Sequence, residues 1–230
     1  MEFGVLGEFI VAHLMLGVMF TRKIMTQNQH LIAGWNTRND WQNCLKQLEK
    51  DSSPEAWTKV FEDFFKPRLE KRYLSPIAIL QEHGEFSGEG FSIMTILCSL
   101  IEFLESTYQG KSYKFLQKGE RLGEHEYSSS KAVFISFLTS KSPFSEQFNE
   151  ELATEFYKSI RCGLLHEATT KNDWRIWAKS SDERIICNDK KLVFRDNFET
   201  GIRKYIDDYC AELIQNQELQ QAFIRKWCSL

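Results

Sequence analysis

Apolar residues recur at helical spacing along most of the chain. The strongest pattern lies between Phe91 and Tyr108, where nearly every position that could face a core is apolar (Ile93, Ile96, Leu97, Leu100, Ile101 and Leu104). A helix that is apolar on almost every side is buried rather than amphipathic. The pattern therefore predicts a deeply buried helix here. Further helices are predicted over residues 36–49, from Pro54 to about Pro67, and over residues 77–81, 131–138, 148–165 and 197–219.

One region near the C-terminus has the character of strands. Residues 174–177 are strand-like, and residues 185–187 and 192–194 are two apolar runs joined by a turn that contains Asn188 and Asp189. Such runs around an Asn-Asp turn predict a β-hairpin. The expected fold class is therefore mainly α, a helical bundle with a small β-hairpin before the C-terminal helix. The glycine-rich residues 84–90 match no phosphate-binding loop and are expected to be a loop. Residues 109–130 are expected to be a loop or lid.

The first residues form a separate apolar segment. Met1–Phe20 is apolar but is interrupted by Glu2, Glu8 and His13, and its longest uncharged run is too short to cross a membrane. Four interpretations stay open: a packed or partner-binding helix, a start-site artefact with Met25 as the natural start, an interfacial membrane helix, and a true span. Residues 1–24 are treated as an extension and residues 25–230 as a single helical domain. A membrane role is not favoured.

Composition narrows the classes of function. The chain has 230 residues, 27% of them charged and 42% hydrophobic, with a net charge of −3. This composition suits one large globular domain and excludes a disordered chain or a surface that is basic overall. Contact with RNA would need a local patch, and one candidate is the cluster Lys66, Arg68, Lys71 and Arg72. This cluster is either a solvated helix face or a phosphate-contacting patch.

Cysteine and histidine spacing gives no sign of a metal or disulfide framework. The six cysteines are widely spaced and no secretory signal is present, so they are expected to be reduced, mostly buried thiols in a cytoplasmic protein. None of the five histidines is spaced as in HxxxH or HExxH. Glu102 and Glu105 could form a carboxylate pair, but exposed helix-flank glutamates are the more common case.

Arg161 and His166 are the candidate chemical pair. Five steps along a helix separate them by about 140° and about 7.5 Å of rise. A histidine can move protons near neutral pH and an arginine supplies a fixed positive charge, a combination that suits phosphodiester cleavage without a metal. The spacing is also compatible with an ordinary capped helix end, in which His166 is satisfied by local backbone and Arg161 is paired to a glutamate.

The residues around this pair resemble a known family. Tyr157–Ala168, with the sequence YKSIRCGLLHEA, resembles the signature helix of the HEPN (higher eukaryotes and prokaryotes nucleotide-binding) superfamily, whose pattern is Arg, four to six residues, His. Residues 88–104 look like the preceding core helix of bacterial HEPN-like proteins. The resemblance covers roughly residues 73–213. Cys162 follows the arginine where the family often has a polar residue, and a thiol is only a weak donor.

The resemblance implies a helical bundle that forms a homodimer and acts as a metal-independent endoribonuclease of toxin–antitoxin or defence type. Arg161 and His166 would be its catalytic pair near the two-fold axis, and the RNA 2′-OH would attack to leave a 2′,3′-cyclic phosphate. No metal or other cofactor is implied. RNA and an antitoxin-type protein are the implied partners. Some relatives only bind nucleotides or partners, so a catalytically silent module is the alternative. An enzyme should present the pair in an open groove with basic residues nearby, whereas a binding module should bury or ion-pair it.

Overall fold

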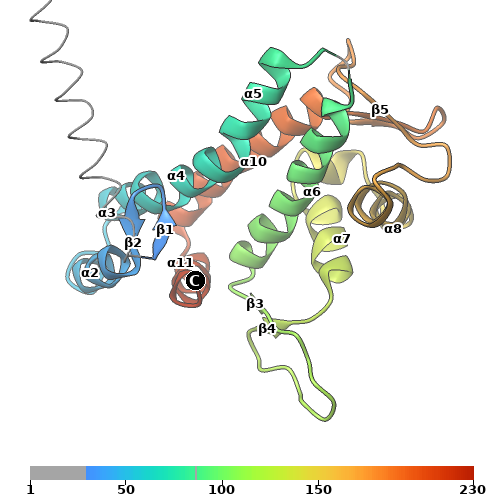
Figure 1. The fold of residues 1–230 in the computed structure, drawn as a ribbon. Helices are drawn as coiled ribbons and strands as arrows, with labels where there is room; N and C mark the ends of the chain where they lie inside the picture. The colour runs from blue at the N-terminus through green and yellow to red at the C-terminus, as the bar shows by residue number, and fades with distance from the viewer. Residues whose placement is uncertain (1–29, 86) are drawn as a thin grey trace, which may run out of the picture.

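The chain is mainly helical, as its apolar pattern predicts. The computed structural model describes residues 30–85 and 87–230, so the predicted N-terminal extension, residues 1–24, lies outside the described residues. Figure 1 shows helices of different lengths packed around α6, with short strands at the periphery. The α-helices are α2 (Arg38–Leu48), α3 (Pro54–Val60), α4 (Lys66–Leu69), α5 (Ser75–His83), α6 (Glu89–Tyr108), α7 (Ser130–Ser140), α8 (Glu150–Phe156), α9 (Cys162–Glu167), α10 (Arg195–Gln215) and α11 (Gln217–Cys228), with a 3₁₀ turn at Phe144–Glu146.

The predicted hairpin is confirmed and belongs to a slightly larger sheet. β6 (Ile186–Cys187) pairs antiparallel with β7 (Leu192–Phe194), and β5 (Arg175–Trp177) adds to the other edge of β7 in parallel. Two further strand pairs were not predicted. β1 (Leu31–Ala33) and β2 (Asn36–Thr37) are antiparallel, and β3 (Ser112–Tyr113) and β4 (Glu126–Tyr127) are parallel. The second of these pairs closes the base of the region predicted to be a loop or lid.

The prolines do not break the helix between α3 and α5, contrary to the prediction of a stop at Lys66-Pro67 and a new helix at residue 77. The segment runs without interruption from Pro54 to His83, because π-helical turns at Phe61–Phe65 and Glu70–Leu74 alternate with α-helix. A proline in a helix cannot donate to the carbonyl four residues before it, and its ring crowds that carbonyl. Here the wider π-turn precedes Pro67, and the side chain of Asn36 donates to the carbonyl oxygen of Asp63 instead. The helix therefore continues past Pro67.

Helix α6 lies at the centre of the hydrophobic core. Its residues Ile93, Leu97 and Leu100 are completely buried, and it contacts α5, α7, α10 and α11 (Figure 1). By length and composition it is the one helix among the described residues that could cross a membrane, yet just over half of its apolar stretch (56%) is buried inside the protein. Packing of this kind is typical of the core helix of a soluble protein.

The C-terminal region differs from the single helix predicted over residues 197–219. Helix α10 ends at Gln215, and Asn216 caps α11, with its side-chain oxygen accepting from the backbone N–H groups of Glu218 and Leu219. The chain turns at this point, so that Phe223 and Trp227 of α11 pack against Trp41 and Phe65. An asparagine side chain that bonds to the following backbone favours helix starts over helix interiors.

All six cysteines are free thiols. The expectation that most of them are buried is wrong, since only Cys98 is fully buried and Cys228 is exposed. Burial raises the pKa of the Cys98 thiol to about 12, so this sulfur is unreactive at neutral pH.

Candidate functional site

The predicted site helix runs from α8 to α9 through a π-helical turn at Tyr157–Arg161. It ends at Ala168, whose φ of 53° is left-handed. The following loop folds back on the helix, where the N–H of Lys171 donates to the Ser159 carbonyl (2.9 Å) and the Asn172 amide donates to the Ser159 hydroxyl (2.9 Å). A side chain at Gly163 would collide with the carbonyl oxygen of Thr169, so this close approach requires glycine. One side of the helix is therefore covered by the loop.

The opposite side of this helix faces solvent and carries both candidate residues. Lys158, Leu165 and His166 are exposed, and Arg161 and Cys162 are half-buried. With about 100° per residue, Arg161 and His166 lie at the two edges of this exposed sector, about 140° apart. Leu165, between them, is 53% exposed. The helix thus presents an uncovered apolar residue flanked by an arginine and a histidine.

Arg161 is held by the core helix α6. Its Nη2 lies 3.7 Å from Oε2 of Glu102, and its guanidinium lies over the ring of Tyr157, 5.4 Å from the centroid. The other oxygen of Glu102 accepts a hydrogen bond from the hydroxyl of Tyr127 (3.1 Å). Glu102 is half-buried, so the prediction of an exposed flank residue is wrong for it. Helical periodicity could place Glu102 near the edge of α6, but it could not indicate which helix would face it.

His166 stands apart from Arg161. No hydrogen bond or ion pair joins its imidazole to another of the described residues, and it is exposed at the end of α9. The chain by itself therefore does not bring the two candidate residues into contact. A complete Arg–His site would need a second molecule, either a substrate that spans the sector or a second copy of the chain.

Buried positive charge surrounds the same carboxylate. Lys226 is 6% exposed and donates to the Lys111 carbonyl (3.0 Å), and it lies within electrostatic reach of Glu102 and Arg68. Burial, with a smaller contribution from Arg68, lowers the pKa of Lys226 to about 8. Arg161, Lys226 and Arg68 thus share one acidic neighbourhood, and local charge here is positive although the whole chain is slightly acidic.

We expect this lysine to give the protein a measurable pH dependence. The folded state releases the Lys226 proton near pH 8, whereas the unfolded chain keeps it to about pH 10.4. Between these values the unfolded state binds more protons, so the free energy of unfolding should rise with pH from 8 to about 9.5. Lys226→Met, which keeps the aliphatic stem, should lack this rise. Denaturant titrations at a series of pH values measure it, and parallel profiles for the two proteins would contradict the assignment.

The basic cluster predicted to contact RNA has mostly structural partners. Lys66 pairs with Glu62 (3.0 Å), and Arg72 donates to the Leu31 carbonyl (2.9 Å). Arg68 donates to the carbonyl of Ile32 and lies over the rings of Phe103 (5.0 Å) and Trp227 (5.8 Å). Lys71 alone of the four is exposed without a partner among the described residues. The two arginines therefore hold strand β1 on the helix, which the sequence could not reveal because β1 was not predicted.

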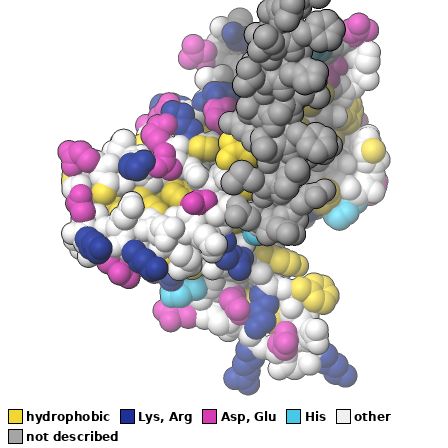
Figure 2. Space-filling view, turned by 60° about the vertical axis from the view of Figure 1, so that its left-hand side comes forward, with side chains coloured by type: hydrophobic (Ala, Val, Ile, Leu, Met, Phe, Trp, Pro, Cys, Tyr) yellow, Lys and Arg dark blue, Asp and Glu magenta, His cyan; other side chains and the backbone are white. Residues whose placement is uncertain are grey.

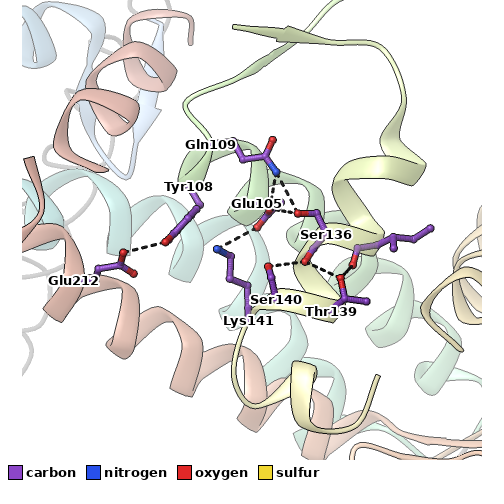
Figure 3. A network of polar contacts seen from close by, with 9 residues as sticks. Glu105, Tyr108, Gln109, Ser136, Thr139, Ser140, Lys141 and Glu212 are labelled. Carbon is purple, nitrogen blue, oxygen red and sulfur yellow. Dashed lines mark hydrogen bonds and ion pairs between the residues drawn. The ribbon is translucent and has the colours of Figure 1, made fainter. Parts of the chain in front are cut away.

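A second polar cluster lies deeper, around Glu105 (Figure 3). The carboxyl of Glu105 is 2% exposed, and its Oε1 accepts from Gln109 and Ser136 at 2.6 Å each. Its Oε2 lies 3.9 Å from Nζ of Lys141, which sits 3.0 Å from the centre of the Tyr108 ring. Burial lowers the pKa of Lys141. Glu102 and Glu105 therefore have separate partners and do not act as a carboxylate pair.

Neither metal ligands nor known relatives define the site further. No group of three His, Cys, Asp or Glu side chains within residues 30–85 and 87–230 is placed to hold a metal ion. No protein-family model, curated protein or solved structure matches the chain. The arrangement of its own residues is thus the basis for any functional conclusion.

Proposed function

We propose that this chain is a metal-independent endoribonuclease of the HEPN type, acting in the cytoplasm as a homodimer with Arg161 and His166 as its catalytic pair. His166 would take the proton from the RNA 2′-OH, and Arg161 would stabilise the negative charge that develops at phosphorus. The products would be a 2′,3′-cyclic phosphate and a 5′-hydroxyl. A toxin or defence role with an antitoxin-type partner belongs to the same proposal.

The observation that carries the proposal is the exposed sector of the site helix. Arg161 is fixed at one edge by Glu102 and Tyr157, His166 is free at the other edge, and the intervening Leu165 is uncovered. A π-helical turn ends at Arg161, and such turns are frequent at functional sites. A two-fold axis beside this sector would cover Leu165 and place Arg161 of one copy near His166 of the other.

The test is cleavage of RNA in the presence of EDTA. Purified protein is incubated with total RNA with and without the chelator, and new ends are identified by sequencing. We expect equal cleavage in both reactions, with 2′,3′-cyclic phosphates at the new 3′ ends. Cleavage that EDTA abolishes, or new 3′ ends that carry hydroxyls, would rule out the proposed chemistry.

One observation favours a second candidate, a catalytically silent HEPN-like binding module. The ion pair with Glu102 already occupies the guanidinium of Arg161, and His166 lies apart from it in the single chain. A module of this type would bind RNA or a protein partner without cleaving it. Absence of cleavage together with retained RNA binding would favour this candidate.

A further inference from the structure

A projecting segment beside Arg161 exposes aromatic side chains to solvent. Residues 112–127, here called the arm, leave the body of the protein between β3 and β4 (Figure 1). Tyr113 is 53% exposed, and Phe115 is 76% exposed. They are two positions apart in extended chain, where alternate side chains point to the same side. Exposing two neighbouring large rings suggests that the arm has a binding partner.

The arm is fastened directly to the candidate site. Tyr127 at its base donates to Glu102, the same carboxylate that pairs with Arg161. The ring of Tyr127 packs edge-on against that of Tyr113, with centroids 5.7 Å apart. Three rings therefore lead outward from the neighbourhood of Arg161 in the order Tyr127, Tyr113, Phe115.

Unpaired cations accompany these rings. Lys118 and Arg121 are exposed and have no ion-pair partner among the described residues, whereas Lys114 is paired with Glu126 (3.3 Å). The projection at the bottom of Figure 2 carries hydrophobic side chains together with Lys and Arg side chains. Flat aromatic surfaces beside cations are the features that bind single-stranded nucleic acid, since the rings stack on unpaired bases and the cations contact phosphates. A duplex keeps its bases stacked internally and cannot use such rings.

We propose that the arm is the RNA-binding element of this protein and that it binds single strands. Tyr113 and Phe115 stack on bases, Lys118 and Arg121 contact phosphates, and the bound strand is led toward Arg161. This inference rests on the proposed function for its RNA substrate. A protein surface that merely covered the rings would also have to supply acid groups for Lys118 and Arg121, whereas an RNA strand supplies both chemistries in every nucleotide.

The probe is a fluorescent 2′-O-methyl oligoribonucleotide, which has no free 2′-OH and so stays intact with the unaltered protein. Its binding is measured as a single strand and as a duplex, by anisotropy at several salt concentrations. We expect the full chain to prefer the single strand. Phe115→Ala and Tyr113→Ala should each weaken binding by about fivefold or more. Lys118→Glu with Arg121→Glu should weaken it further and lower the salt dependence by about 0.7 log units per lost phosphate contact.

Matched controls lie on other parts of the surface. Trp177→Ala removes another half-exposed ring (52% exposed) on β5, and Lys46→Glu with Lys50→Glu reverses two exposed charges on and just after α2. Both controls should bind like the unaltered protein. The proposal is overturned if the arm variants bind normally, if the duplex is preferred, or if the probe does not bind at all. A change from dimer to monomer in Phe115→Ala with unchanged affinity would instead make the arm an interface between copies.

The outcome also separates this inference from the proposed function. Cleavage of unmodified RNA that persists with unchanged KM in the arm variants would refute the role of the arm and leave the nuclease intact. Binding that depends on the arm, with no cleavage of unmodified RNA, would do the reverse.

Discussion

Alanine at His166 or at Arg161 is expected to reduce RNA cleavage to background. Loss of a general acid–base group or of a charge-stabilising donor typically costs 10²–10⁴-fold in rate. Neither change should unfold the protein: His166 is exposed without a partner, and the Arg161–Glu102 contact is a 3.7 Å pair at the edge of the core, worth about 1 kcal/mol. Cleavage rates and thermal unfolding of each variant measure the two effects separately. Glu167→Ala, on the same helix turn, is the control and should cleave normally.

The shared site makes a sharper form of this prediction. When inactive Arg161→Ala and inactive His166→Ala proteins exchange subunits, a mixed dimer keeps one intact Arg161 and one intact His166 on different chains. Part of the activity should return if the two copies complete one site. If exchange is confirmed by mass and the mixture stays inactive, the site does not span two chains.

Arg161→Lys examines the geometry of the charge. A lysine keeps the positive charge, but it lacks the planar fork that can contact a carboxylate and a phosphate together. We expect this variant to retain at most a small part of the cleavage rate. Full activity in Arg161→Lys would mean that charge alone is required at this position.

The core helix and the hairpin could be predicted from the sequence because their signals are local. The apolar run from Ile93 to Leu104 gives α6, and Asn188-Asp189 gives the turn between β6 and β7. The continuous helix through Pro67 could not be predicted, because it depends on a π-turn and on Asn36 from a distant strand. The turn at Asn216 had a local signal, but the apolar spacing of the flanking residues concealed it.

The candidate site was predictable only as residue types on one helix. The motif pointed to Arg161 and His166, and the structure places both on the same exposed sector. Their surroundings come from elsewhere in the chain: Glu102 from α6, Tyr127 from the base of the arm and Lys226 from α11. Such partners are set by tertiary packing, so no spacing rule within the motif could identify them. Arg68 and Arg72 show the opposite error, since a basic cluster that suggested RNA contact holds strand β1 instead.

The largest loss of stability is expected at Glu105. Removal of this carboxyl in Glu105→Ala leaves the ammonium of Lys141, which is 12% exposed, without its charged partner. It also removes the acceptor for Gln109 and Ser136. Breaking one side of a buried ion pair costs about 3–5 kcal/mol, because the remaining charge is left uncompensated. Urea or thermal unfolding should show a loss in this range, and a loss below about 1 kcal/mol would contradict it.

A paired substitution distinguishes lost charge balance from lost packing. Glu105→Leu alone should be strongly destabilising, since Lys141 stays charged in an apolar place. Adding Lys141→Met removes that charge while it keeps much of the side-chain volume, and replacing both members of a buried pair by apolar residues is often neutral or stabilising. We therefore expect the double variant to be more stable than Glu105→Leu. If the second change lowers stability further, packing of the lysine stem on Tyr108, 3.0 Å from the ring centre, outweighs the charge. The edge of the cluster offers a control, because the hydrogen bond from Tyr108 to Glu212 (3.0 Å) is exposed and Glu212→Ala should cost little.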